Sequence, residues 1–195
     1  RLIEKAWPYL DKEIKNDYDQ LVRNKARLDQ QQIGYTQVQY LYMRSFLKNE
    51  LRNEDRKAHD YFRNQADKYW SGFNAFTKGM IALALHRSGN TVAPKAIIQS
   101  LRETAIRKEE MGMYWVQRGY GYHWYEAPIE TQSLLIECFS EIDKDLATVD
   151  QLKIWLLKNK QTNNWETTKA TADACYALLL TGNDWLDSTP LVSLQ

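Results

Sequence analysis

The sequence predicts an all-α fold, and three observations support this class. The chain has only 8 glycines and 4 prolines in 195 residues, and it lacks runs of β-branched residues, a composition that favours helices over strands. Apolar residues recur at helical spacing along most of the chain. Segments that are apolar on one side alternate with segments that are apolar almost all round, and helices of the second kind must be enclosed by others.

Eight helices are expected, separated by short polar or glycine-containing segments. The predicted ranges are 1–24, 35–47, 55–70, 73–87, 92–108, 128–142, 149–158 and 167–180. Pro8 interrupts the first pattern and is expected to mark the true start of that helix, because proline is favoured at the first helical position. Gly89 suits the left-handed conformation that ends many helices. Residues 111–132 contain many aromatic side chains and are expected to form a loop that leads into the sixth helix.

An internal repeat relates three of these helices. One constant shift along the sequence places Thr131 on Thr168 and Cys138 on Cys175, and a second shift places Thr77 on Thr131. Each helix has a threonine near its start and a small residue seven positions later. Equivalent positions on neighbouring helices lie ~8–10 Å apart, whereas a disulfide needs Cα atoms within about 7 Å. Both cysteines are therefore expected to be buried packing residues with free thiols.

The alternation of the two kinds of helix predicts helical hairpins with the apolar helices on the inside. Stacked hairpins can form an open superhelix or close into an α/α toroid, and the aromatic segments that precede the apolar helices favour the toroid. The chain would supply about four hairpins of a partial ring. Its length is that of one domain, so residues 1–195 are expected to form a single helical domain or a fragment of one.

The bulk composition excludes several classes of function. The net charge is +1 with acidic and basic residues interspersed, which argues against a nucleic-acid partner. No apolar run approaches the ~18 residues of a membrane span. Two cysteines make no disulfide framework, and the three histidines, His59, His86 and His123, are too scattered to suggest a zinc site. No cofactor is predicted.

Two acids and four aromatic residues are the candidate cavity-lining residues. They are Trp115, Trp124, Tyr125, Glu130, Trp165 and Glu166. Helix-barrel glycosidases place two carboxylates ~5.5 Å or ~6.5–9.5 Å apart among such rings. We favour a simpler interpretation, in which an acid in the first turn of a helix interacts with free amides and the helix dipole. The rings are then expected to close one end of the helical core, and no catalytic residue is assigned.

Six blocks of sequence carry a family resemblance and together span nearly the whole chain. They are residues 40–45, 110–115, 124–132, 153–157, 160–162 and 165–180. These blocks resemble the thioester-type, complement-like helical domain of large bacterial alpha-2-macroglobulin-like proteins. The resemblance implies an α/α toroid in a protease inhibitor of the periplasm or cell envelope. Its implied partners are the other domains of the parent protein and, through the parent, the target proteases.

The resemblance also implies where the reactive chemistry of such inhibitors would lie. Members that trap proteases covalently carry an internal thioester between a cysteine and a glutamine three residues later. Here Cys138 is followed at that distance by Glu141, and Cys175 by Leu178, so neither cysteine can form the bond. The chain therefore lacks a thioester motif, and the resemblance implies a non-enzymatic role.

Two other functions fit the sequence. One is an α/α-toroid carbohydrate-active enzyme that uses Glu130 and Glu166 as its carboxylate pair. The other is a helical-repeat module that binds a protein partner on its concave face. Because of the family resemblance, we favour the protease inhibitor over both of these functions.

Overall fold

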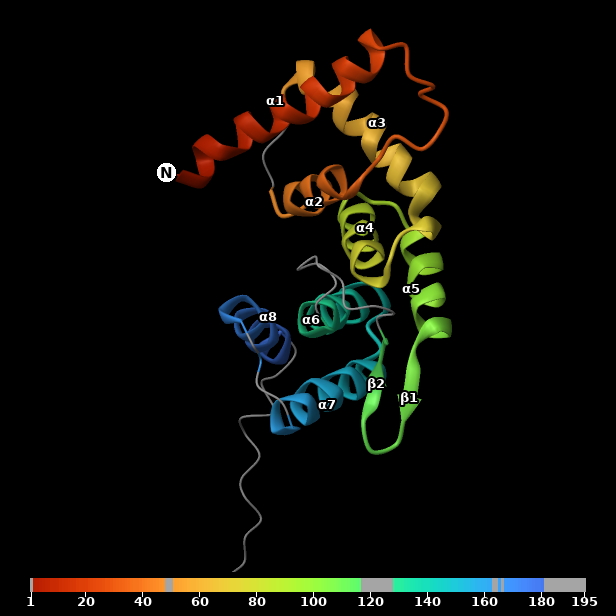
Figure 1. The fold of residues 1–195 in the computed structure, drawn as a ribbon, viewed down its shortest axis with the longest axis vertical. Coiled ribbons are helices and arrows are strands. Elements are labelled where there is room, and N and C mark those ends of the chain that lie inside the picture. The colour runs from red at the N-terminus through yellow and green to blue at the C-terminus, as the bar shows by residue number, and fades with distance from the viewer. Residues whose placement is uncertain (1, 48–50, 117–127, 163–164, 166, 181–195) are drawn as a thin grey trace, which may run out of the picture. The chain divides into compact units, whose positions relative to one another are not determined.

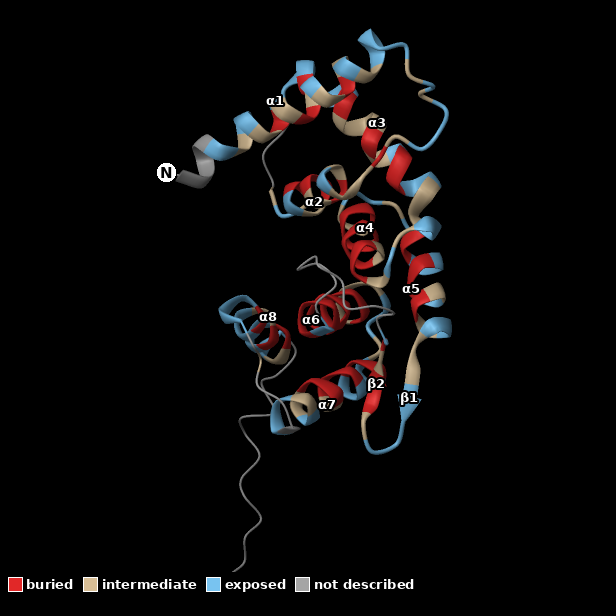
Figure 2. Ribbon diagram, in the orientation of Figure 1, coloured by how far each residue is buried: buried red, intermediate tan, exposed pale blue. Residues whose placement is uncertain are grey.

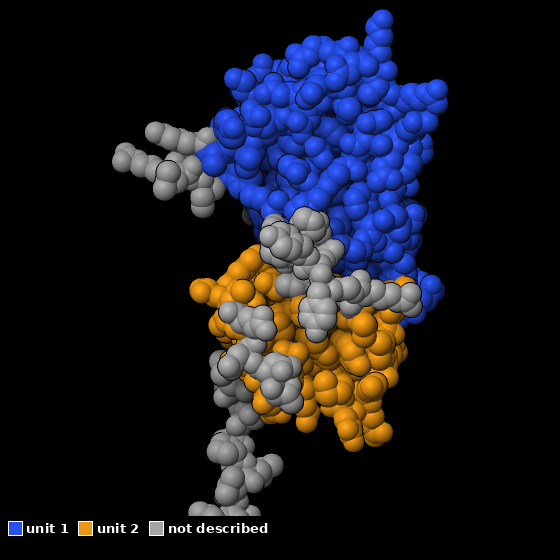
Figure 3. All heavy atoms as spheres, viewed as in Figure 1, with its two compact units in different colours: residues 1–103 blue, residues 104–195 orange. Residues whose placement is uncertain are grey.

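The computed structural model describes residues 2–47, 51–116, 128–162, 165 and 167–180. The prediction of a mostly helical chain is confirmed, since eight α-helices occur in these ranges (Figure 1). The chain divides into two compact units, Arg1–Glu103 and Thr104–Gln195, which Figure 3 shows in blue and orange. A single domain over 1–195 stays a prediction.

Unit 1 is built from helices throughout its described part. Its elements are α1 (Leu2–Arg23), α2 (Tyr35–Arg44), α3 (Asn53–Tyr69), the 3-10 turn η1 (Trp70–Gly72), α4 (Ala75–Arg87) and α5 (Ala93–Thr104), the last residue of which belongs to unit 2. Pro8 lies inside α1 and not at its start, so that prediction was wrong. A proline at this position costs one backbone hydrogen bond, and the amphipathic pattern continues on both sides of it.

The core of unit 1 forms where alternate helices meet. Helix α1 packs against α3, and α2 packs against α4. Ile14 of α1, Val38 and Leu41 of α2, and Phe62 of α3 are buried. Nearly all of α4 is buried (Figure 2), which confirms that an all-round apolar helix is enclosed by its neighbours. Gly89, just beyond α4, has a φ of 88°. This confirms the prediction that it takes the left-handed conformation at the end of the helix.

Unit 2 contains a short β-hairpin besides its helices. Its elements are β1 (Ile106–Lys108), β2 (Gly112–Tyr114), α6 (Pro128–Cys138), the π-helical turn η3 (Phe139–Asp143), α7 (Leu146–Thr162) and α8 (Thr168–Leu179). The strands pair antiparallel with Ile106 opposite Tyr114. The helix predicted over 92–108 therefore ends at Thr104, and the expected loop over 111–132 begins as a strand. Three-residue strands are too short to produce a readable alternation in the sequence.

The ends of α6 and α7 differ from the prediction for local reasons. The α-helical part of the sixth helix stops at Cys138, and a π-helical turn continues to Asp143, where Lys144 takes a left-handed φ of 56°. Helix α7 begins earlier than predicted because Asp145 caps it: its Oδ1 accepts a hydrogen bond from the backbone N–H of Thr148 at 3.1 Å. Helix α6 packs against α7 and α8, and α7 packs against β2.

The two cysteines lie in different environments. Both thiols are free, as predicted, but only Cys138 is buried, and Cys175 is exposed. The prediction of two buried thiols was wrong for Cys175. Helix α8 buries only the small side chains Ala170, Ala174 and Ala177, so the residues between them on the helix surface face outward. The repeat in the sequence is thus not matched by equal burial in α6 and α8.

Candidate functional site

Three of the six candidate cavity-lining residues lie in the described part of unit 2. Glu130 is in the first turn of α6, and the residue is only 5% exposed. This position is the one from which a carboxylate interacts favourably with the helix dipole. Trp124, Tyr125 and Glu166 lie outside the described residues.

The described aromatic residues of this region contact other rings or a lysine. The Trp115 ring is buried, with its centre 6.2 Å from that of Phe139. Its neighbour Tyr114 stacks on Trp155 of α7, with ring centres 5.8 Å apart and an angle of 19° between the rings. Trp165 lies beneath Lys160, whose Nζ is 5.3 Å from the ring centre. Trp115 and Tyr114 are thus part of the packing of unit 2.

Gln132 is a polar residue that the sequence analysis did not single out. It is buried in α6, and its Nε2 donates hydrogen bonds to the carbonyl oxygens of Met113 at 2.8 Å and Leu152 at 3.0 Å. One amide group therefore joins α6 to β2 and α7. In the sequence Gln132 stands between Thr131 and Ser133, and nothing in that polar stretch indicates this role.

Lys153 is another buried polar residue of unit 2. It lies in α7 within an apolar run and is 1% exposed. Burial lowers the pKa of the Lys153 amine, and the nearby Asp150 carboxylate partly opposes this effect. Within the described ranges, no three His, Cys, Asp or Glu side chains gather as metal ligands do.

A cavity of unit 2 lies beside the hairpin. It has a volume of about 380 Å³ and is lined by β1, the turn after it and the start of α7. Arg107, Lys108 and Glu109 give this lining mixed charge. Two of these groups are basic and one is acidic, so the charged part of the lining has a small basic excess.

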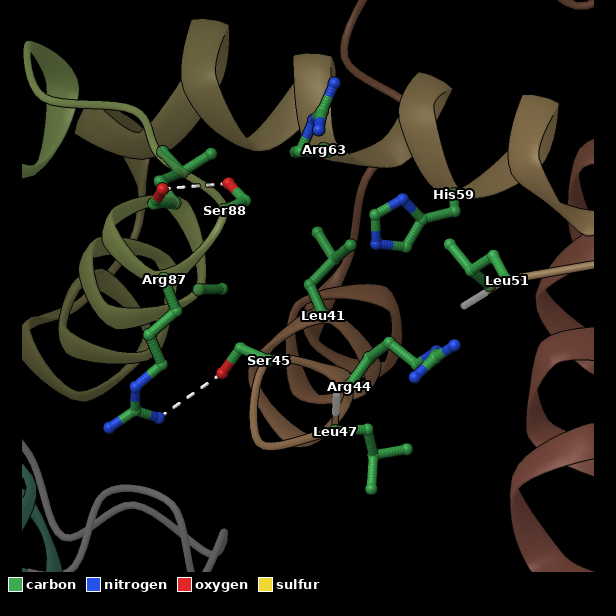
Figure 4. A pocket seen from close by; sticks show the side chains of 11 residues that line it. Leu41, Arg44, Ser45, Leu47, Leu51, His59, Arg63, Arg87 and Ser88 are labelled. Atoms are coloured by element: carbon green, nitrogen blue, oxygen red, sulfur yellow. Dashed lines mark hydrogen bonds between the residues drawn. The ribbon is translucent and has the colours of Figure 1, made fainter. Parts of the chain in front are cut away.

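The cavity of unit 1 has a more distinctive lining. It has a volume of about 190 Å³ and lies among the C-terminal parts of α2 and α4 and the side of α3. We call it the unit 1 cavity. Its basic lining residues are Arg44, Arg63, Arg87 and His59, which come from three helices (Figure 4). Because the three helices are separate in the sequence, sequence patterns did not indicate that these basic residues line one cavity.

A buried polar network adjoins this cavity. Asp11 of α1 and Arg44 of α2 are both buried, with Arg44 Nε 3.3 Å from Asp11 Oδ1. The hydroxyl of Tyr40 donates to the same carboxylate oxygen at 2.7 Å. Burial, together with this hydrogen bond, raises the pKa of Tyr40. The tyrosine therefore remains a hydrogen-bond donor throughout the physiological pH range.

His59 faces the same cavity and is mostly buried. Burial lowers the pKa of the imidazole, because the charged form loses its water. Asp60 opposes this effect, with its Oδ1 3.4 Å from His59 Nδ1. The ring of Tyr40 meets the imidazole edge-on at 6.1 Å. His59 is thus held largely neutral at pH 7 beside the arginines.

Arg87 lies at the edge of the unit 1 cavity, in contact with a hydroxyl and two rings. Its Nη1 donates to Ser45 Oγ at 3.3 Å. The guanidinium carbon lies 4.2 Å from the centre of the Phe46 ring and 5.7 Å from that of Tyr42. Such stacking uses the face of the guanidinium group and holds its plane in one orientation.

Comparisons with protein-family models, with curated proteins and with solved structures find no match to this chain. No described helix combines the length and the apolar character that crossing a membrane requires.

Proposed function

We propose that this chain is a non-enzymatic helical part of a bacterial alpha-2-macroglobulin-like protease inhibitor. The observation that carries the proposal is the resemblance of the long blocks at 110–115, 124–132 and 165–180 to the thioester-type domain of such proteins. The mostly helical fold supports it. In this role the chain serves as a structural and interaction module of a protease trap in the bacterial periplasm or envelope.

The helices are proposed to be hairpins of an α/α toroid, about four of them in a partial ring. In stacked hairpins, each helix packs on the helix two places along as well as on its partner. The packing of α1 on α3, of α2 on α4 and of α6 on α8 supports this arrangement. The burial of almost all of α4 and α6 supports their assignment as inner helices.

The proposal assigns no covalent chemistry to this chain. Cys138 is buried and is followed three residues later by Glu141, and Cys175 is followed by Leu178. A thioester needs a glutamine side chain within reach of the thiol, so any thioester would belong to another part of the parent protein. The partners of the chain would then be the other domains of that parent.

A protease-entrapment assay on the longer parent protein tests the proposal. An enclosed protease keeps its active site but cannot admit a large substrate. The parent, incubated with a protease, is expected to suppress cleavage of casein and to leave cleavage of a small chromogenic peptide intact. Undiminished casein cleavage, or equal loss of both activities, would contradict trapping.

The variant Glu130→Gln separates this function from a carbohydrate-active enzyme that uses Glu130 and Glu166. Protease entrapment is expected to be unchanged in this variant, because the proposal gives Glu130 no chemical role. Hydrolysis of a glycan by the unaltered protein that is abolished by Glu130→Gln would favour the enzyme instead. A reducing-sugar assay on a panel of plant and bacterial polysaccharides provides the measurement.

A further inference from the structure

Several of the residues that line the unit 1 cavity are apolar, and we call this group its floor. Its apolar lining residues are Leu41, Leu47, Leu51, Ala84 and Leu85. The volume of about 190 Å³ equals the liquid volume of about six water molecules. That space is sufficient for one aliphatic side chain of four carbon atoms. Burial of such a side chain against leucines is favourable, since it removes apolar surface from water.

Cationic side chains surround this floor. Arg63, Arg44 and Arg87 point in three different directions around the cavity (Figure 4). None of the described lining residues is acidic. Asp11 beside Arg44 and Asp60 beside Arg63 offset part of the charge from outside the lining. The guanidinium groups are spread apart, so they suit an extended ligand with several carboxylates better than one small anion.

An exposed aromatic residue adjoins the cavity lining. Phe46 is 52% exposed, although the lining residue Arg87 stacks on it. An apolar floor with an arginine-rich rim and an adjoining aromatic residue is the composition of protein-binding surfaces, in which arginine and aromatic residues are enriched.

We propose that the unit 1 cavity docks an acidic peptide segment that inserts one aliphatic side chain between the arginines. The aliphatic side chain occupies the leucine-lined floor, and flanking carboxylates meet Arg63 on one side and Arg87 on the other. The charge complementarity of the rim selects the sign of the partner, and the floor selects its apolar residue. This inference does not depend on the protease-inhibitor function.

The alternative interpretation is that these arginines only stabilise the fold. Arg44 and Arg87 occupy the last turns of α2 and α4, where a cation interacts favourably with the helix dipole. That role alone predicts no affinity for acidic peptides. Peptide binding therefore distinguishes the two.

The direct test is fluorescence anisotropy of a labelled, end-blocked peptide with the full 195-residue chain. The probe is Asp-Glu-Leu-Glu-Asp, and its controls are the same peptide with alanine for leucine and with amides for all four acids. Saturable binding of the probe is expected. The alanine control is expected to bind at least about tenfold more weakly, because the floor loses three carbons of contact. The amide control is expected to show no measurable binding.

Variants of α3 test the site itself. Arg63→Gln is expected to weaken binding by about two- to fivefold, the range that one exposed ion pair contributes. Arg63→Lys keeps the charge and is expected to retain most of the affinity. Arg56→Gln is the matched control, because Arg56 is an exposed arginine of the same helix outside the cavity lining. Circular dichroism establishes that each variant is folded.

Several results would overturn the proposal. They are no binding of the probe, equal binding of the amide control, and equal weakening by Arg63→Gln and Arg56→Gln. Light scattering of the chain alone provides a further outcome. A dimer that Arg63→Gln dissociates would make a second copy of the chain the occupant of the cavity, and would rule out a separate peptide partner.

Discussion

At the scale of single residues, Gly112 shows how closely the hairpin approaches α7. Its φ is +75°, a conformation that side chains rarely adopt. A Cβ atom at this position would lie 2.1 Å from the backbone oxygen of Gln151. Backbone atoms cannot move aside as a flexible side chain can, so the contact requires that the residue has no side chain.

Gly112→Ala is therefore expected to lower the free energy of unfolding by about 2–5 kcal/mol, from backbone strain together with overpacking. Urea denaturation followed by circular dichroism provides the measurement. Gly72→Ala is the control, because nothing lies within 4 Å of its added Cβ. That variant is expected to change stability by less than about 1 kcal/mol. Equal effects of the two substitutions would show that the close approach to Gln151 is absent.

His59 makes the stability of unit 1 depend on pH. Burial lowers its pKa in the folded chain below 6.5, whereas the unfolded chain binds a proton near pH 6.5. The unfolded state thus binds more protons in the window between the two pKa values. The contribution of His59 is complete above about pH 7.5 and is lost as the pH falls through 6.5 towards the folded pKa.

We expect the urea midpoint of the unaltered chain to decrease between pH 7.5 and pH 5.5 more steeply than that of His59→Gln. Glutamine is neutral at both pH values, so the variant lacks this contribution. An identical pH dependence in the two proteins would mean that the imidazole accepts a proton in the folded state as easily as in water.

At the scale of elements, the stability of α4 depends on its N-cap residue as well as on the burial of its side chains. The side-chain oxygen of Asn74 accepts a hydrogen bond from the backbone N–H of Thr77 at 2.9 Å. Asn74→Ala is expected to lower stability by about 1 kcal/mol, because this amide then loses its partner. Asn74→Ser keeps an acceptor and is expected to lose less. Thermal unfolding of the three proteins in parallel measures the difference, and equal losses in both variants would contradict a capping role.

The helices were predictable because their apolar spacing is regular over many residues. The nearly continuous apolar run over 75–87 predicts both the α4 helix and its burial. The strands β1 and β2 were not predictable, since three residues carry no period. The start of α7 was missed because the sequence does not distinguish an aspartate that caps a helix, as Asp145 does, from an aspartate in an ordinary polar loop.

The candidate sites show a similar limit. Glu130 was correctly placed in the first turn of a helix, because a proline such as Pro128 is typical of the first helical position. The unit 1 cavity had no signal in the sequence, since Arg44, Arg63 and Arg87 belong to three helices and each resembles an ordinary surface residue. The exposure of Cys175 was missed for a related reason. An apolar-looking helix is buried only where neighbours cover it, and sequence does not report the neighbours of α8.

At the scale of the whole molecule, both cysteines belong to unit 2, and unit 1 has none. Ellman's reagent is expected to label one thiol per native chain rapidly, because Cys175 is exposed and Cys138 is buried. In guanidinium chloride two thiols are expected to react. Cys138→Ser should keep the rapid phase and Cys175→Ser should remove it. Two rapid thiols in the native chain would show that α6 opens readily.

Labelling of Cys138 therefore reports the unfolding of unit 2 alone. The pH dependence of His59 and the cap of α4 report on unit 1. Measured together on one chain, these probes show whether the two units unfold in one transition or in two. Coincident transitions would favour the single domain expected over 1–195.

Two contacts between the hairpin of unit 2 and neighbouring helices lie away from its tip. Gln132 binds the carbonyl of Met113, and Gly112 abuts α7, whereas Glu109 and Glu110 at the tip are exposed. An epitope tag inserted between Glu109 and Glu110 would extend the turn without disturbing either contact. The tip is thus the natural place to attach a fluorophore or an affinity handle to this protein while its packing stays intact.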